Sequence, residues 1–514
     1  MKKWPIGWTG IIAILLFGLS MVNCEGVINS STDCISDCTR KFCGDSDGCG
    51  GTCTACQDAD QHCNTANWQC QSCVSQCSGR CGGPDSGCLG QNCPNTCDTN
   101  QTCDATTNYI QCKSCTSGCG GDFSADTFLP WEGRPAYYSQ WSNGPSSDQN
   151  YFPLSVWLQD PSNASRYKAI GINLFIGLWD GPTTGQLSSL ATSQMPVFCS
   201  QDQMIFTDKN ANMIRGWLQQ DEPDNAQPLD GGGYGPPVDP SVIVDRYNTM
   251  KTTDPTRPVQ LNLGQGVAWD GWWGRGDWTN QPGDYVNYAK GGDILSYDIY
   301  PMNLDPSQST TDWMIAELEK VSQSLWYVPD GIDRLRAWTD YKKPVWMALE
   351  TTNIGGDTPH PPTPATTKSE VWMSIIHGAS GIIYFCHQWG SDGNLISETG
   401  LLDDAAMSAA VKNINAQIIS LAPVLNTQSV GNGVTTGSSN TTVPVDTMLK
   451  RYNKYTYLFA VSMRPGATTA TFTLRDFPAS ASAEVIGESR NISVNNGVFQ
   501  DTFSNYTVHI YKIK

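Results

Sequence analysis

Residues 215–223 read Arg-Gly-Trp-Leu-Gln-Gln-Asp-Glu-Pro, a short run that leads from apolar residues into two carboxylates and a proline. A strand that ends at once in polar residues is typical of a βα unit. Outward from this segment, short apolar runs alternate with amphipathic stretches from about residue 125 to residue 426. The alternation indicates an α/β fold with a parallel sheet.

Eight candidate strands can be counted along this part of the chain. They are 152–158, 172–179, 196–200, 215–222, 258–264, 293–300, 344–351 and 381–389. In the intervening segments, such as 241–252 and 313–325, apolar residues recur every three or four positions, as in helices, and 404–421 is the last helix. The pattern predicts a (β/α)8 TIM barrel over residues 122–426.

Catalytic groups of such a barrel lie at the C-terminal ends of its strands. The fourth predicted strand ends in Asp221 and Glu222, and the seventh ends in Glu350. A buried carboxylate is costly unless it is used or paired. Glycoside cleavage needs two carboxyls, because one protonates the departing oxygen and the other attacks or activates water on the opposite face of the sugar. The sequence therefore predicts a glycosidase.

A family resemblance rests on the same residues. Asp221-Glu222-Pro223 ending strand four, with Glu350 ending strand seven, resembles the retaining glycoside hydrolases of clan A. Residues 372–385, Trp-Met-Ser-Ile-Ile-His-Gly-Ala-Ser-Gly-Ile-Ile-Tyr-Phe, are similar to the last helix and strand of the β-galactosidase-like branch, around families 35 and 42. The resemblance implies a double displacement without a cofactor, with Glu222 as acid/base and Glu350 as nucleophile.

The chain departs from that family at position 221, where the clan usually has Asn and this sequence has Asp. Adjacent Asp-Glu pairs also occur in substrate-assisted hexosaminidases, in which the acetamido group of the sugar is the nucleophile. In this alternative Asp221 orients the acetamide, Glu222 is the acid and Glu350 is structural. The clan A interpretation is favoured, because the alternative leaves the end of strand seven without a role.

Polar and aromatic residues at other strand ends are candidates for sugar binding. The tryptophans after strand five can stack on sugar rings or simply fill a long loop. The polar pair at strand six can bind the nucleophile or a hydroxyl, or it can be a buried pair that satisfies the backbone. The predicted substrate-binding residues are Asp221, Asn262, Trp269, Trp272, Trp273, Asp298, Tyr300, His387 and Trp389.

The composition narrows the class of partner. The chain has 514 residues, with 31 Lys and Arg against 49 Asp and Glu and a net charge of −18. Because phosphate binding depends on clustered Lys and Arg, this balance argues against nucleic acid. Only 16% of residues are charged, whereas 18 are Trp and 19 are Tyr. Such a surface suits a neutral carbohydrate, and with five His and no ligand cluster no metal is expected.

The first residues read as an export signal. Lys2 and Lys3 precede an apolar run at 11–19 that is too short to span a membrane. A signal peptide is therefore expected at residues 1–24, and the protein is expected to be extracellular or at the cell surface. Cys24 stands where a bacterial lipoprotein carries its lipidated cysteine, so an N-terminal lipid anchor and simple cleavage nearby are both open.

Most of the 21 cysteines lie in one segment, residues 25–121. The spacing Cys-x2-Cys-x3-Cys at residues 70–77 recurs at 112–119, which predicts a tandem repeat of disulfide-stapled modules. A spacer, stalk or cell-surface contact is the expected role. Cys199 and Cys386 lie in the barrel and are expected to be buried free thiols.

The C-terminal part has a different pattern. Residues 427–442 are rich in Gly, Ser, Thr and Asn, which predicts a linker, and residues 443–514 alternate apolar and polar positions between turn signals. A β-sandwich is expected there, with a structural role. A non-catalytic carbohydrate-binding surface protein is the competing functional class, and the presence of both Glu222 and Glu350 speaks against it.

Overall fold

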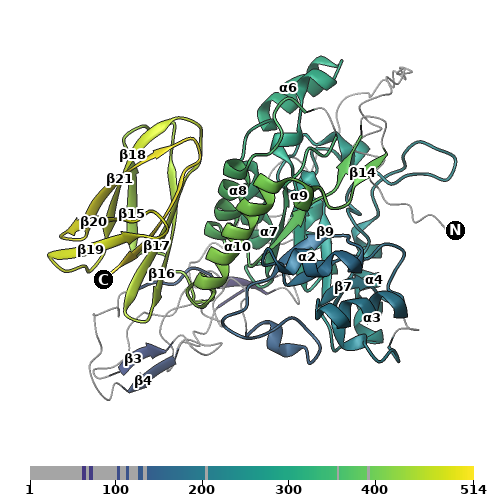
Figure 1. Ribbon diagram of the computed structural model, residues 1–514, viewed down its shortest axis with the longest axis horizontal. Helices are drawn as coiled ribbons and strands as arrows, with labels where there is room; N and C mark the ends of the chain where they lie inside the picture. Colours follow the sequence, from purple (N-terminus) through teal and green to yellow (C-terminus); the bar gives the residue numbers. More distant parts are fainter. Residues whose placement is uncertain are drawn as a thin grey trace. The chain divides into compact units, whose positions relative to one another are not determined.

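The computed structural model describes residues 126–130, 136–202, 206–355, 358–390 and 394–514, together with the backbone of four short strands between residues 61 and 114. The chain divides into two compact units. In the first unit, residues 136–429 form a barrel and residues 434–514 form a sheet (Figure 1). The second unit contains the four short strands.

Eight parallel strands form a closed barrel, as the sequence predicted. The first and last strands, β5 and β12, pair with each other, with Ser155 opposite Ile383, and so close it. The strands are β5 Leu154–Trp157, β6 Leu174–Ile176, β7 Val197–Ser200, β8 Ile214–Leu218, β9 Val259–Leu263, β10 Ile294–Asp298, β11 Val345–Glu350 and β12 Gly381–Phe385.

Helices follow the strands and cover the barrel. Thr183 and Thr363 form capping boxes at the starts of two of them, and Asp404 accepts two backbone hydrogen bonds at the start of the longest. Among the described helices, none is both long and apolar enough to cross a membrane. The helices are α2 Ala164–Lys168, α3 Thr184–Ser193, α4 Pro240–Thr253, α5 Tyr285–Tyr288, α6 Asp312–Val321, α7 Tyr327–Trp338, α8 Pro364–Ile376, α9 Gly400–Asp403 and α10 Ala405–Leu425.

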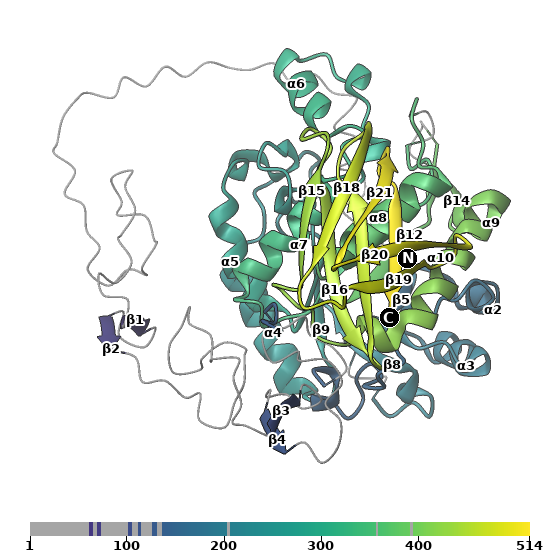
Figure 2. The same ribbon diagram turned by 90° about the vertical axis from the view of Figure 1, so that its left-hand side faces the viewer.

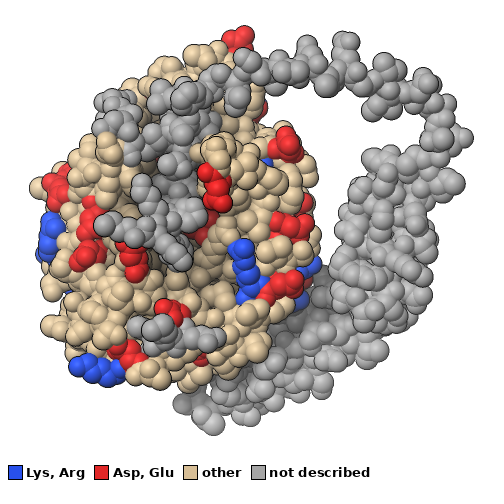
Figure 3. Space-filling view, turned by 90° about the vertical axis from the view of Figure 1, so that its right-hand side faces the viewer, with Lys and Arg blue, Asp and Glu red and all other residues tan. Residues whose placement is uncertain are grey.

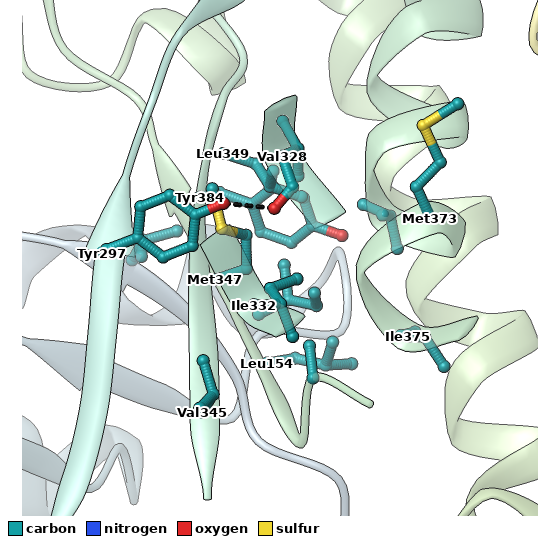
Figure 4. Packing of buried hydrophobic residues seen from close by; sticks show 14 of the residues in the cluster. Leu154, Tyr297, Val328, Ile332, Val345, Met347, Leu349, Met373, Ile375 and Tyr384 are labelled. Atoms are coloured by element: carbon teal, nitrogen blue, oxygen red, sulfur yellow. Dashed lines mark hydrogen bonds between the residues drawn. The ribbon is translucent and has the colours of Figure 1, made fainter. Parts of the chain in front are cut away.

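The alternation along β11 divides its side chains between two cores. Trp346 and Ala348 belong to the cluster inside the barrel, whereas Val345, Met347 and Leu349 pack between the barrel and its helices. Figure 4 shows this outer layer beside α8. Each such fully buried aliphatic side chain stabilises the fold by about 1.5–3 kcal/mol. This layer fixes the strand whose end carries a predicted catalytic residue.

The C-terminal residues form one eight-stranded antiparallel sheet that curls over on itself. Tyr511 of β22 contacts Phe472 of β18 with ring centroids 5.6 Å apart, although these strands are not neighbours in the sheet. The predicted linker contains the first strand, β15. The strands are β15 Val434–Ser438, β16 Val445–Tyr452, β17 Tyr455–Ser462, β18 Ala467–Leu474, β19 Ser480–Val485, β20 Arg490–Asn495, β21 Val498–Ser504 and β22 Val508–Ile513.

The sheet packs on the helices of the barrel, and Figure 2 shows its strands in front of α7, α8 and α10. Trp372 of α8 stacks on Phe459 of β17 with ring centroids 5.7 Å apart. At the end of α8, the ring of His377 lies between Asp333 of α7, at 2.8 Å, and Asp446 of β16, at 3.3 Å. Apolar stacking and a charged bridge therefore join sheet and barrel.

The second unit contains two hairpins of the same kind at the two positions of the sequence repeat. Strand β1 Gln61–Asn64 pairs with β2 Gln69–Ser72, and β3 Gln101–Asp104 pairs with β4 Gln111–Ser114. In both, a cysteine of one strand is in register with a cysteine of the other. The predicted signal peptide, the lipidation of Cys24 and the pairing of the cysteines lie outside the described residues. The two barrel cysteines, Cys199 and Cys386, are free and buried, as predicted.

Candidate active site

The ends of six barrel strands line a small pocket, part of it open to solvent. Three of its lining residues carry carboxyl groups, and no Lys or Arg lines it. The described residues contain no cluster of His, Cys, Asp and Glu arranged to hold a metal ion. The pocket is lined by Trp157, Asp221, Glu222, Asn262, Asp298, Tyr300, Ala348 and Phe385.

Five residues that the sequence singled out meet here, although they come from three different strand ends. They are Asp221, Glu222, Asn262, Asp298 and Tyr300. The convergence follows from the barrel itself, because all eight parallel strands end on the same side.

Glu222 has an unusual backbone conformation. Its φ is 41°, in the left-handed region that residues with a side chain rarely adopt. Its amide donates to the carbonyl of Asn262 at 3.1 Å, and its carbonyl accepts from the amide of Asn225 at 3.1 Å. Such a conformation costs about 1–3 kcal/mol and persists only where surrounding contacts impose it, as they do at many functional sites.

The side chain of Asn262 joins two of the carboxylates. Its Nδ2 donates to Oδ1 of Asp221 at 3.0 Å and to Oδ1 of Asp298 at 3.3 Å. Its Oδ1 accepts from the hydroxyl of Ser296 at 2.8 Å, and that hydroxyl in turn accepts from Nε2 of Gln260 at 2.9 Å. The amide is thereby held in one orientation. We expected Asn262 to donate to sugar hydroxyls, but its donors are directed at the carboxylates instead.

Burial and mutual repulsion set the protonation of the carboxyl groups. Burial raises the pKa of Asp221 to about 6. Burial and the charge of Asp221 raise the pKa of Asp298 to about 7. The pKa of Glu222 is raised well above its ordinary value, first by burial and then by Asp298 and Asp221. No cation lines the pocket to oppose these shifts, so Glu222 holds its proton more readily than an ordinary glutamate.

A buried network that we did not predict supports the loop after β8. Asp224 is fully buried and accepts from the amide of Gly264 at 2.9 Å and from the hydroxyl of Tyr285 at 2.8 Å. Arg275, also buried, donates to the backbone carbonyl of Asp224 and pairs with Asp284. These contacts fix the residues that immediately follow Glu222. The sequence signal was a second carboxylate after Pro223 and a lone Arg among the tryptophans.

Glu350 is not among the residues that line the pocket. Its buried carboxylate accepts from the amide of Met302 at 2.7 Å and from the amide of Asn303 at 3.0 Å, and the side chain of Asn303 donates to it as well. Both donors belong to a 3-10 turn, η9 Pro301–Asn303, just after Tyr300. The expected pairing of Glu222 and Glu350 in one pocket is therefore not found.

A second buried carboxyl lies next to Glu350. Burial and the charge of Glu350 raise the pKa of Glu370, on α8, well above its ordinary value. Burial raises the pKa of Glu350 itself to about 7, although the hydrogen bonds from Met302 and Asn303 oppose this shift. Of this buried pair, Glu370 has no hydrogen bond that opposes the shift, whereas Glu350 does.

The tryptophan loop after β9 does not form the sugar-stacking wall that the sequence suggested. Trp269 and Trp272 are 2% and 5% exposed, and their indole nitrogens donate to Glu317 and Asn225. Their ring centroids lie 5.4 Å apart, so the rings pack against each other. Trp273 is half-buried against them. The wall prediction is wrong for Trp269 and Trp272, because core packing covers their faces.

His387 and Trp389 lie beside the pocket without lining it. The ring of His387 is 1% exposed and contacts the ring of Phe385, with centroids 5.2 Å apart. Trp389 packs against the cluster of Tyr300, Ile354 and Phe385. Three lining residues, Trp157, Ala348 and Phe385, were missed. Trp157 and Phe385 are the last residues of β5 and β12, and a position near the end of a strand was the available signal.

No protein-family model matches the sequence, and no curated protein is significantly similar to it. Among solved structures, the chain is similar to a GH30 endoxylanase from Clostridium papyrosolvens C71, at 13% identity and a TM-score of 0.37, over 76% of this chain and 97% of that chain. It is also similar to an alpha-amylase from Geobacillus thermoleovorans, at 11% identity and a TM-score of 0.39, over 71% of this chain and 98% of that chain. A third similar structure is a family 51 alpha-L-arabinofuranosidase from Bifidobacterium longum, at 10% identity and a TM-score of 0.41, over 75% of this chain and 98% of that chain. These are likenesses of fold.

Proposed function

We propose that the protein is an O-glycoside hydrolase whose general acid is Glu222. The observation that supports this proposal is a single pocket in which the pKa of Glu222 is raised well above its ordinary value while the pKa of the adjacent Asp221 is about 6. Glycoside cleavage requires this combination, because the leaving oxygen must receive a proton while negative charge stabilises the sugar cation. The aromatic residues of the lining suit the apolar faces of a sugar ring.

The arrangement favours the substrate-assisted mechanism over the clan A mechanism. The clan A mechanism needs Glu350 opposite Glu222, but the carboxylate of Glu350 accepts hydrogen bonds from η9 and does not line the pocket. These hydrogen bonds support a structural role for the end of strand seven. The argument against the Asp221-Glu222 mechanism is thereby removed, and the favoured substrate carries a 2-acetamido group.

The proposed chemistry proceeds in two steps. The acetamido oxygen of the sugar attacks the anomeric carbon while Glu222 gives its proton to the departing glycosidic oxygen, and the bond between that oxygen and the anomeric carbon breaks. Asp221 accepts a hydrogen bond from the acetamido N–H and stabilises its positive charge. Glu222, now ionised, takes a proton from water, whose oxygen bonds to the anomeric carbon and reopens the ring formed by the acetamide.

The test compares aryl glycosides with and without the 2-acetamido group. We expect hydrolysis of the N-acetylhexosaminide, a loss of about 10²–10⁴-fold in kcat for Glu222→Gln, and a much smaller loss for Glu350→Gln. The decisive variant is Glu350→Gly with azide as an added nucleophile. Formation of a glycosyl azide there would make Glu350 the nucleophile and restore the clan A mechanism. Absence of hydrolysis of every glycoside would overturn the hydrolase itself.

We also propose that the protein acts outside the cytoplasm. The supporting features are Lys2 and Lys3 before the apolar run at 11–19 and the cysteine-rich segment that follows. Mass spectrometry of the mature N-terminus tests this. Cleavage at or near residue 24 is expected; a diacylglyceryl group on Cys24 would identify a lipid anchor, and an intact Met1 would contradict export.

A further inference from the structure

Two buried nitrogen atoms beside the pocket have no hydrogen-bond partner among the described residues. They are Nε1 of Trp157 and Nδ1 of His387. Trp157 lines the pocket at the end of β5, and His387 follows the end of β12. A buried polar atom without a partner costs about 1–3 kcal/mol, so each such atom in a native structure needs an explanation.

The two residues lie on either side of the line where β5 and β12 close the barrel. Ser155 is in register with Ile383, so Trp157 and Phe385 lie at the same level. Phe385 contacts the ring of His387, and Nε2 of His387 lies 2.8 Å from the carbonyl oxygen of Leu158, the residue after Trp157. The imidazole therefore packs on Phe385, and the indole packs on the cluster that contains Phe385, which lines the pocket.

The contact with Leu158 fixes the chemical role of each nitrogen. A carbonyl oxygen only accepts, so Nε2 of His387 carries the hydrogen. Burial lowers the pKa of His387 to about 4, which keeps the ring neutral and leaves Nδ1 as an acceptor. Nε1 of Trp157 can only donate. A donor and an acceptor without a partner among the described residues are thus carried by two rings that pack on the same cluster.

The backbone at this position is also unusual. Leu158 has a φ of 45°, in the left-handed region, and its amide donates to the carbonyl of Ile176 at 2.6 Å. For a bulky residue this conformation is a genuine outlier, and such outliers concentrate at ligand sites. The conformation aims the carbonyl of Leu158 at His387 and so orients the imidazole.

We propose that Trp157 and His387 together bind one hydroxyl group of the sugar in the pocket. The indole N–H donates to the hydroxyl oxygen, and the hydroxyl hydrogen is donated to Nδ1 of His387. A hydroxyl does both, whereas a carboxylate or sulfate cannot donate to Nδ1 and an apolar group satisfies neither nitrogen. The carboxyls of Asp221, Glu222 and Asp298 oppose an anionic group as well. The ligand class rests on the proposed function.

The experiment measures sugar binding in an inactive protein, Glu222→Gln, by titration calorimetry. The probes are N-acetylglucosamine and its 3-deoxy, 4-deoxy and 6-deoxy analogues. Trp157→Phe removes the donor and keeps a ring, and His387→Gln keeps a donor for the carbonyl of Leu158 while removing Nδ1. Trp372→Phe is the matched control, because its Nε1 is also buried and without a partner among the described residues but packs against the C-terminal sheet.

We expect Trp157→Phe and His387→Gln each to weaken N-acetylglucosamine binding about fivefold to tenfold, and Trp372→Phe to leave it unchanged. One deoxy analogue is expected to bind the Glu222→Gln protein weakly. Its affinity is expected to fall no further when Trp157→Phe is added, because the missing hydroxyl and the missing indole N–H remove the same hydrogen bond. Parent-like affinity of Trp157→Phe, or equal losses for all analogues, would overturn this inference alone. Binding without hydrolysis in the wild-type protein would overturn only the proposed hydrolase, and no binding of any sugar would overturn both.

Discussion

At the scale of single residues, Glu222 owes its properties to its neighbours. Its backbone is held in the left-handed region, and its proton is retained because Asp298 and Asp221 lie in the same buried pocket. Asn262 prevents these two aspartates from moving apart, since its single amide group donates to both. The acid therefore depends on carboxylates that need not touch the reacting bond.

The pH dependence of hydrolysis tests this interpretation. Activity needs Asp221 ionised and Glu222 protonated, so kcat/KM is expected to rise as pH increases through about 6 and to fall as it passes the raised pKa of Glu222. Asp298→Asn is expected to move the alkaline limb to lower pH, because removal of a negative neighbour lowers the pKa of Glu222. Asp277→Asn, an exposed site, is the control. An unchanged alkaline limb in Asp298→Asn would contradict the argument.

Residues with a direct chemical signature were predictable, and those placed by backbone contacts were not. Asp221, Glu222 and Asp298 stand out because carboxylates at the ends of buried strands are rare. The position of Glu350 was not predictable, because its partners are the backbone amides of Met302 and Asn303. Nearly every residue has a backbone amide, so the sequence does not indicate which amides donate to a side chain.

At the scale of elements, the bridge between α7, α8 and β16 is the clearest polar connection between barrel and sheet. His377 contacts Asp333 on one side and Asp446 on the other. Hydrogen bonds to these aspartates outweigh burial and raise the pKa of His377 to about 9. The ring is therefore charged at neutral pH.

Replacing His377 tests that bridge. His377→Gln is expected to cost about 1 kcal/mol of stability, since both aspartates are partly exposed to solvent. A raised pKa stabilises the folded state fully below the ordinary value of 6.5, and the contribution is lost as pH rises through about 9. Urea unfolding at pH 6 and pH 10 should thus separate wild type and variant only at pH 6. His360→Gln, an exposed histidine, should match wild type at both; a pH-independent loss in His377→Gln would argue against the charged bridge.

The elements themselves were largely predictable, because the hydrophobic period is a local property. All eight barrel strands appear where the sequence placed them. Strand β15 was missed inside the predicted linker, because the composition of its sequence, Val-Thr-Thr-Gly-Ser, is typical of a loop. It is a strand because β18 supplies its partner, with Thr436 opposite Phe472, and that pairing is not local.

At the scale of the whole molecule, an excess of buried acid dominates the electrostatics. The net charge is −18, and Figure 3 shows more Asp and Glu than Lys and Arg on the face it presents. Burial raises the pKa of seven carboxyls, which are therefore protonated more readily in the folded state than in the unfolded chain: Asp221, Glu222, Asp224, Asp298, Asp330, Glu350 and Glu370.

Stability is accordingly expected to fall as pH rises from about 4.5 to beyond 7. At pH values between the ordinary pKa of a carboxyl and its raised pKa in the folded state, the folded protein binds more protons than the unfolded chain. The free energy of unfolding therefore decreases as pH rises through this range. Carboxyls with a lowered pKa, such as Asp254 and Asp501, change the stability with pH only below the ordinary pKa of a carboxyl. Differential scanning fluorimetry across this range should give a decreasing Tm, with a shallower slope for Glu370→Gln. A Tm that rises toward pH 8 would contradict the prediction.

The junction of β5 and β12 also has a kinetic consequence. Leu158 and His387, which meet there, are 229 residues apart in the sequence. Contacts of such long range require most of the intervening chain to be ordered, so they contribute to slow folding. A sugar bound by both Trp157 and His387 would link β5 and β12, the first and last strands of the barrel. We therefore expect bound sugar to slow the opening of the barrel, and so to lengthen the lifetime of the folded protein against proteolysis.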